Sequence, residues 1–83
     1  MKKHDEKTST KILKFIDEYT HKEKWAPSVR EIGKAVYLSS TSTVFAHLER
    51  LANAGLIEKQ AGSPRALRVT KKGVRFLESI KEV

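Results

Sequence analysis

The sequence predicts a small α+β domain in which a core of three helices is followed by an antiparallel β-hairpin and a short carboxyl-terminal helix. Apolar residues recur at helical spacing in three early segments, and after Gly55 they alternate with charged residues as in strands. The chain has 83 residues, 39% hydrophobic and 33% charged, which is enough apolar material for one core. We therefore expect residues 1–83 to form a single domain.

The first helix is expected over about residues 9–22, where Ile12, Ile16 and Tyr19 share one face. Hydroxyl residues fill positions 8–10, and a side-chain oxygen from this group would cap the first turn. The apolar face should be turned toward the core.

A short strand and a second helix are expected next. The residue before Pro27 is pushed out of the α region, which favours extended backbone and a short strand at residues 24–27. Ser28 and Glu31 have the spacing of a capping box, so the second helix is expected over about residues 28–36.

The third helix determines the architecture. Only residues 37–40 separate it from the second helix, and helices joined by so short a turn cross steeply, as in a helix-turn-helix. It is expected over about residues 41–54, with Val44, Leu48 and Leu51 on the face that is turned to the core.

The opposite face of the third helix is small and polar at its start. Such a surface can approach base edges in a major groove, and the alternative is an ordinary solvated helix face. His47 lies nearer the apolar face and is expected to be a buried, hydrogen-bonded histidine. The outer residues are Ser42, Thr43, Phe45, Ala46, Glu49, Arg50 and Asn53.

A β-hairpin is expected after Gly55, which stands where a helix end favours a left-handed residue. Two short strands around Ile57 and Val69 are joined by the turn-rich residues 60–64. A hairpin after a helix-turn-helix is a wing, and its tip beside Arg65 could lie on a phosphate backbone or in a minor groove. The alternative is a hairpin that only covers the core.

The charge of the chain favours a polyanionic partner. Seventeen Lys and Arg against ten Asp and Glu give a net charge of +7. No acidic residue lies between Glu58 and Glu78, whereas basic residues are frequent there. We expect a nucleic acid as partner, with a solvated basic surface as the alternative.

Several function classes are excluded by what the chain lacks. It has no cysteine, so disulfides and thiolate metal sites are excluded, and its histidines do not have metal-ligand spacing. No cofactor is expected, and no catalytic constellation is recognisable, so we do not expect an enzyme. The polar amino terminus and the absence of a long apolar run favour a soluble, cytoplasmic protein.

Five motifs together point to a known family: PSVREIG, SSTSTV, HLERL, GLIE and PRAL. With these motifs the chain resembles the amino-terminal DNA-binding domain of LexA repressors over about residues 9–70. The resemblance implies a winged helix-turn-helix that places its third helix in the major groove of a palindromic operator on double-stranded DNA, and so represses transcription.

The resemblance also implies which residues contact DNA. Carried onto matching positions, the base-contacting candidates are Ser40, Ser42, Thr43, Phe45 and Ala46. From the wing, the candidates are Gly62, Ser63 and Arg65. Two basic residues beside these positions, Arg50 and Arg68, complete the expected contact surface.

The chain departs from the family pattern at three points. A LexA repressor carries a second, self-cleaving domain with a Ser-Lys dyad, for which 83 residues leave no room. Tyr37 stands where the family usually has Gly, and a left-handed tyrosine there would cost about 1 kcal/mol. An additional helix is expected over residues 71–83, where the family has a flexible linker.

This additional helix has an apolar stripe of four residues: Phe76, Leu77, Ile80 and Val83. We expect a homodimer that forms through the stripe, and the alternative is that the helix packs back on the first helix. A second function class also follows, namely a winged-helix protein-interaction module that docks a partner here and binds nucleic acid weakly. Duplex RNA is disfavoured because its narrow major groove does not admit a helix.

Overall fold

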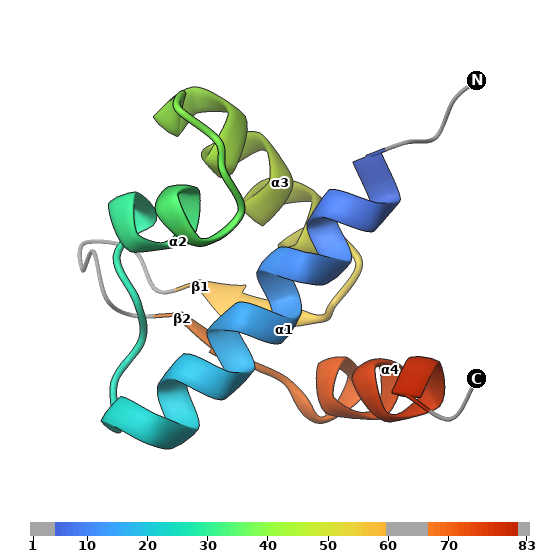
Figure 1. Cartoon of the computed structure of the whole chain (residues 1–83). Helices are drawn as coiled ribbons and strands as arrows, with labels where there is room; N and C mark the ends of the chain where they lie inside the picture. Colours follow the sequence, from blue (N-terminus) through green and yellow to red (C-terminus); the bar gives the residue numbers. More distant parts are fainter. Residues whose placement is uncertain (1–4, 60–66, 82–83) are drawn as a thin grey trace.

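The computed structural model describes residues 5–59 and 67–81. In chain order it contains helix α1 (Asp5–Glu23), helix α2 (Val29–Ala35), helix α3 (Thr41–Asn53), strand β1 (Ile57–Lys59), strand β2 (Leu67–Val69) and helix α4 (Lys71–Lys81) (Figure 1). The predicted α+β winged helix-turn-helix class is confirmed, because three helices, an antiparallel strand pair and a further helix follow one another in the expected order.

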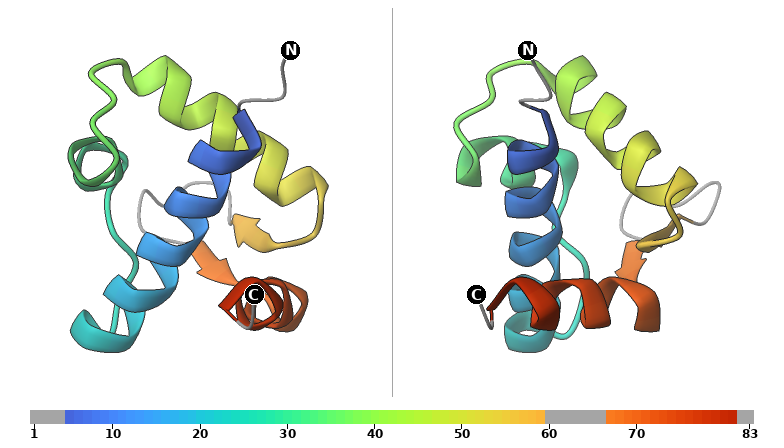
Figure 2. Two further views of the ribbon diagram at one scale, coloured as in Figure 1. Left: turned by 45° about the vertical axis from the view of Figure 1, so that its right-hand side comes forward. Right: turned by 90° about the vertical axis from the view of Figure 1, so that its right-hand side faces the viewer.

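Helix α1 lies at the centre of the molecule and contacts the other three helices and β2. Helices α2 and α3 lie toward one end of α1, whereas α4 crosses near the other end (Figure 2). Ile12, Leu13 and Ile16 of α1 are fully buried, as their helical spacing predicted. The other buried core residues belong to α2, α3, β1 and α4, and the partly buried side chains of β2 pack against them. These core residues are Ile32, Val44, Leu48, Leu51, Ile57 and Leu77.

Helix α1 begins four residues earlier than expected, and its predicted cap is wrong. The hydroxyl residues at positions 8–10 lie inside the helix, and Ser9 is buried with 7% of its surface exposed. A serine on the inner face of a helix must find a hydrogen-bond partner in the core, and Ser9 does so across 38 residues of sequence in His47.

The expected strand at residues 24–27 does not form in the described structure. Lys24 ends α1 in the left-handed region at φ 73°, and its amide donates to the carbonyl oxygen of Thr20 at 2.9 Å. Ala26 and Pro27 are buried, so this segment closes the core. Pro27 has no amide hydrogen to give to a ladder, and the sheet of the described residues contains β1 and β2 alone.

The predicted capping box of α2 is confirmed. The amide of Glu31 donates to Ser28 Oγ at 3.1 Å, and the amide of Ser28 donates to Glu31 Oε1 at 2.7 Å. The Tyr19 hydroxyl donates to Glu31 Oε2 at 3.1 Å, which joins the start of α2 to α1. The cap therefore fixes both the start of α2 and its position on α1.

The strands pair in antiparallel register, with Ile57 opposite Val69 and Glu58 opposite Arg68. Gly55, at φ 79°, makes the left-handed turn that leads from α3 toward β1, as its position predicted.

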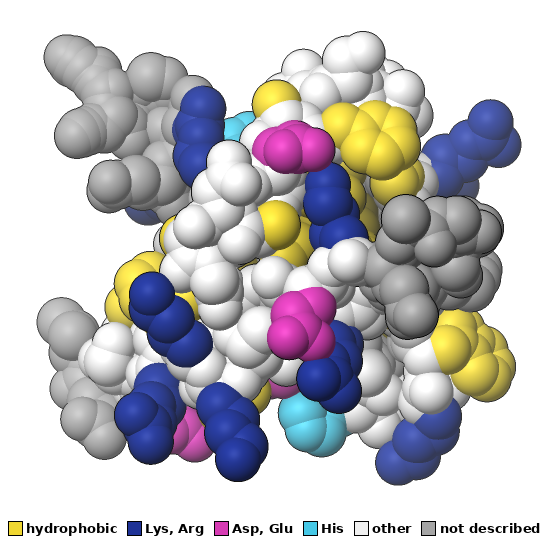
Figure 3. Space-filling model, turned by 180° about the vertical axis from the view of Figure 1, so that it is seen from behind, with side chains coloured by type: hydrophobic (Ala, Val, Ile, Leu, Met, Phe, Trp, Pro, Cys, Tyr) yellow, Lys and Arg dark blue, Asp and Glu magenta, His cyan; other side chains and the backbone are white. Residues whose placement is uncertain are grey.

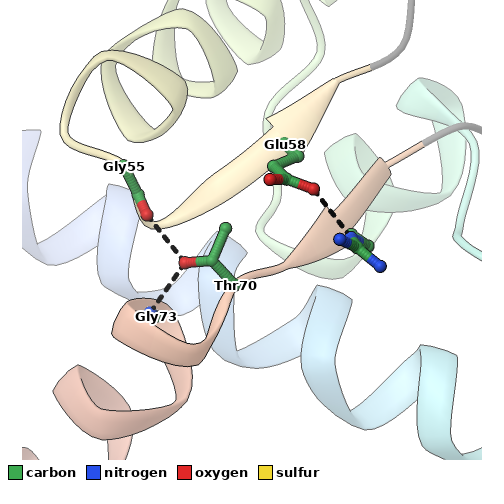
Figure 4. Close-up of polar contacts among 5 residues, drawn as sticks. Gly55, Glu58, Thr70 and Gly73 are labelled. Atoms are coloured by element: carbon green, nitrogen blue, oxygen red, sulfur yellow. Dashed lines mark hydrogen bonds and ion pairs between the residues drawn. The ribbon is translucent and has the colours of Figure 1, made fainter.

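Thr70 joins β2 to α4 and ties both to the end of α3. Its hydroxyl donates to the carbonyl oxygen of Gly55 at 2.7 Å and accepts from the amide of Gly73 at 3.0 Å (Figure 4). Gly73 is buried against the loop before β1. A Cβ at this position would collide with the carbonyl oxygen of Leu56 and lie 2.6 Å from Val69 Cγ1. Helix α4 can therefore lie close to the sheet only with glycine at this position.

Candidate nucleic-acid interface

Helix α3 has two chemically different faces. Val44, Leu48 and Leu51 are buried in the core, as predicted, with no more than 4% of each exposed. The exposed surface of α3, which we call the outer face, has Ser42, Ala46, Glu49 and Asn53 opposite the core and Thr43, Phe45 and Arg50 on the flanks. Helix α3 lies at the edge of the molecule, so this face is open to a large partner (Figure 2).

The start of α3 is held by Ser40. Its Oγ accepts from the amide of Thr43 at 3.4 Å, and its carbonyl oxygen accepts from the amide of Val44 at 3.3 Å. The structure thus gives this predicted base-contacting residue a capping role, while its side chain stays exposed. The first turn of α3 holds no acidic residue, so the partial positive charge of the helix end faces solvent undiminished.

Four other candidates lie together on the outer face, where the sequence placed them. Ser42, Thr43 and Ala46 are small and exposed, so the backbone of α3 can come close to another molecule. Phe45 has 51% of its surface exposed, which is high for a phenylalanine. This set combines hydroxyl groups that donate and accept hydrogen bonds with two apolar side chains that can touch a thymine methyl group.

Arg50 is also exposed, near the carboxyl end of the outer face. Its neighbour Glu49 forms an ion pair with Lys59 of β1, at 3.1 Å between Oε2 and Nζ. This pair ties α3 to the wing and neutralises the acid on the outer face, which would otherwise repel phosphate. The sequence did not predict this ion pair. Glu49 and Lys59 are ten residues apart and lie in different elements, so no helical or strand periodicity connects them.

A buried hydrogen bond holds α3 against α1. Ser9 Oγ and His47 Nδ1 are 2.8 Å apart, and His47 has only 5% of its surface exposed. The prediction of a buried, hydrogen-bonded histidine is confirmed. Because this buried bond joins α1 to α3, it limits how the two helices can slide past each other.

The wing is described only along its strands. The predicted contacts Gly62, Ser63 and Arg65 lie outside the described residues. Arg68 on β2 is exposed, and its Nε donates to Glu58 Oε1 across the strand pair at 2.8 Å (Figure 4). Arg68 would have to leave or share this acidic partner in order to bind a phosphate.

The basic charge of the described surface is mixed with acidic groups. On the side turned away from the viewer in Figure 1, Lys and Arg side chains are spread widely, with Asp and Glu side chains between them (Figure 3). The wing strands show the same pattern, since both Lys59 and Arg68 have a carboxylate partner. The basic side chains of the described residues therefore do not form one continuous patch on this side.

The apolar stripe predicted on the last helix is divided by the fold. Leu77 has 4% of its surface exposed and belongs to the core, so its predicted place in a docking face is wrong. Phe76 and Ile80 are exposed by 36% and 39%. Val83 lies outside the described residues. Leu77 is buried because α4 packs on α1 and β2, which is the alternative that the sequence left open.

In the described ranges, no group of three or more His, Asp or Glu side chains could hold a metal ion. No helix within those ranges is both long enough and apolar enough to cross a membrane.

Comparison with known proteins agrees with this geometry. A family model described as the LexA DNA binding domain matches residues 6–66, which cover α1 from its second residue, α2, α3 and β1. The chain belongs to the LexA DNA-binding domain family. Strand β2 and helix α4 lie beyond the residues that the family model matches.

Curated relatives support this membership. The chain is 52% identical to a LexA repressor of Oenococcus oeni over 66 residues, which are 80% of this chain and 31% of that protein. It is 46% identical over 77 residues to a LexA repressor of Lactiplantibacillus plantarum, covering 93% of this chain and 37% of the relative. A LexA repressor of Enterococcus faecalis is 47% identical over 72 residues, 87% of this chain and 34% of its own length. The chain thus spans about a third of the length of these relatives.

Proposed function

We propose that this LexA-type domain binds double-stranded DNA in a sequence-specific manner and acts as a transcriptional repressor, with α3 in the major groove. The observation that carries the proposal is the outer face of α3, where Ser42, Thr43, Phe45 and Ala46 are exposed together while the opposite face is fixed in the core. A rigid helix with a small, polar outer face meets the steric and hydrogen-bonding needs of a major groove about 12 Å wide. The family description and the repressor relatives support the same reading.

Electrostatics would bring the domain to DNA and hold it in register. A net charge of +7 favours a polyanion, and the acid-free first turn of α3 places a helix end where a phosphate would be stabilised. The wing contacts proposed for Gly62, Ser63 and Arg65 would add backbone or minor-groove contacts beside those of α3. These roles need no catalytic group, and in a bacterium they would be performed in the cytoplasm, where the chromosome lies.

The experiment begins by selecting binding sites from random duplexes and then measures affinity for one selected half-site. Thr43→Glu should lower the affinity by about 1–3 kcal/mol, because it adds a negative charge and removes a hydroxyl at the outer face. Ser79→Glu adds the same charge at an exposed position of α4 and serves as the matched control. Equal affinities for both variants and the wild type would remove α3 as the reading element, and failure to select any site would remove sequence-specific binding.

The exposed apolar residues of α4 favour a second element of the proposal, a homodimer on a palindromic operator. Phe76 and Ile80 are one turn apart on the exposed side of α4. Pairing of two such stripes about a two-fold axis would present two copies of α3 to one palindrome. Analytical ultracentrifugation should show a dimer for the wild type and a monomer for Phe76→Asp with Ile80→Asp, both at exposed positions. A monomeric wild type at high protein concentration would contradict the dimer.

The same residues would serve the other function class, a protein-interaction module with weak DNA binding. Salt dependence separates the two classes. Binding of DNA through several Lys and Arg residues should weaken steeply as salt rises, because counterions are released on binding. An interface made by Phe76 and Ile80 should respond little to salt, because it buries mainly apolar surface.

A further inference from the structure

Tyr37 combines two unfavourable properties at one position of the connector between α2 and α3. Its backbone is left-handed at φ 61°, a conformation that is unfavourable for a residue with a side chain. Its side chain is 94% exposed, so the aromatic ring gains almost nothing from packing inside the domain. The fold itself is therefore not stabilised by a tyrosine here, and glycine would suit the backbone better.

The connector around Tyr37 is rigid. The amide of Leu38 donates to the carbonyl oxygen of Gly33 at 2.8 Å, and the amide of Tyr37 donates to the carbonyl oxygen of Lys34 at 3.4 Å. Leu38 is half-buried and packs against the core. The phenol therefore extends into solvent from a fixed base, and little conformational entropy of the backbone would be lost if it met a partner.

The position of Tyr37 relative to α3 indicates what that partner is. Tyr37 precedes the cap residue Ser40 by three residues, a distance of at most about 10 Å along the chain. The major groove is about 12 Å wide and is bordered on both sides by a phosphate backbone. A side chain within about 10 Å of a helix that lies in the groove is therefore near one of these backbones. Lys34 is exposed one turn before Tyr37, so a positive charge near this position would attract a phosphate group.

We propose that Tyr37 is a DNA-contacting residue whose hydroxyl donates to a phosphate at the edge of the half-site read by α3. Tyrosine is among the side chains that bind phosphate oxygens, and such contacts set the register of a protein on the duplex without reading its sequence. The strain at Tyr37 is then retained because the contact with DNA outweighs it. This inference rests on the proposed DNA binding, since it concerns the same interface.

The test uses opposite changes in stability and affinity. Tyr37→Gly removes both the backbone strain and the phenol. Relief of the strain stabilises the folded state, whereas the greater entropy of glycine in the unfolded chain opposes it. The folding equilibrium constant should therefore stay equal or rise up to about fivefold. Its affinity for a selected half-site should fall about fivefold or more. Tyr37→Phe retains the strain and the ring and loses only the hydroxyl, so it should show most of the affinity loss at unchanged stability.

Lys24→Gly is the matched control for strain. Lys24 is also left-handed and exposed, but it ends α1. The stability of this variant should stay equal or rise, as that of Tyr37→Gly should. Any affinity that it loses should come with a smaller salt slope, because a charge is removed. Loss of affinity in Tyr37→Gly should leave the salt slope unchanged, since tyrosine is neutral.

Three results would overturn the inference. Wild-type affinity in both Tyr37 variants would show that the exposed ring does not contact DNA. A loss of stability in Tyr37→Gly would show that the ring supports the fold. A loss of affinity that occurs only on duplexes with two half-sites would show that Tyr37 contacts the second copy of the protein. Failure of the wild type to bind any selected duplex would contradict the proposed function itself, and is thus distinguishable from all three.

Discussion

Helices α3 and α4 are both amphipathic, but they are held in the domain by different means. Helix α3 inserts Val44, Leu48 and Leu51 into the core and adds a buried hydrogen bond through His47. Helix α4 has one core side chain, Leu77, and otherwise depends on close approach at Gly73 and on its cap. The difference teaches that the proposed DNA-binding helix is fixed by several core side chains along its length, whereas α4 is fixed by one core side chain and by its contacts at Thr70 and Gly73.

The largest expected effect tests the inner face of α3. Leu48 has 2% of its surface exposed, and Leu48→Ala should lower the free energy of unfolding by about 3 kcal/mol, because it removes transfer energy and leaves a cavity. Urea denaturation followed by circular dichroism measures this loss. A change below about 1 kcal/mol would mean that α3 is held less firmly than its burial indicates.

A smaller effect tests the close approach of α4. Gly73→Ala should lower the free energy of unfolding by about 2 kcal/mol, because the added methyl group must displace the loop at Leu56 or the side chain of Val69. Native-state hydrogen exchange should show faster exchange in α4 and unchanged protection in α3. Equal loss of protection in both helices would contradict the difference drawn between them.

The smallest expected effect concerns the cap of α4. Thr70→Ala removes the oxygen that accepts from Gly73 and the hydroxyl that donates to Gly55, so stability should fall by about 1 kcal/mol. Thr70→Ser retains both hydrogen bonds and should remain within about 0.5 kcal/mol of the wild type. Thermal unfolding of the two variants side by side measures the contribution of the hydroxyl, and similar losses in both would assign it to the methyl group instead.

Local patterns predicted the parts of the fold that local physics determines. The capping box at Ser28, the left-handed Gly55 and the apolar face of α3 each depend on residues within about one or two turns. Helical periodicity likewise separates an outer face of α3 from an inner one, whereas the candidate DNA contacts on the outer face followed from the resemblance to LexA repressors.

What sequence reasoning missed depends on contacts between distant residues. The bond from Ser9 to His47 spans 38 residues, and nothing in the sequence indicates that Ser9 lies inside α1 and faces the core instead of capping the helix. Leu77 was assigned to a docking face because the sequence does not show which side of α4 meets α1. The pairing of Lys59 with Glu49 likewise depends on where β1 lies beside α3.

The short strands of the wing also affect how the protein behaves in concentrated solution. A two-stranded sheet has two open edges, and such edges can recruit strands from other molecules and start aggregation. Each strand here has only three residues, and Glu58, Lys59 and Arg68 place charges on them. Charged edges of this length give an incoming strand few hydrogen bonds, and its approach would strip water from the charged side chains. The wing can thus remain exposed for its partner without making the protein prone to form fibres.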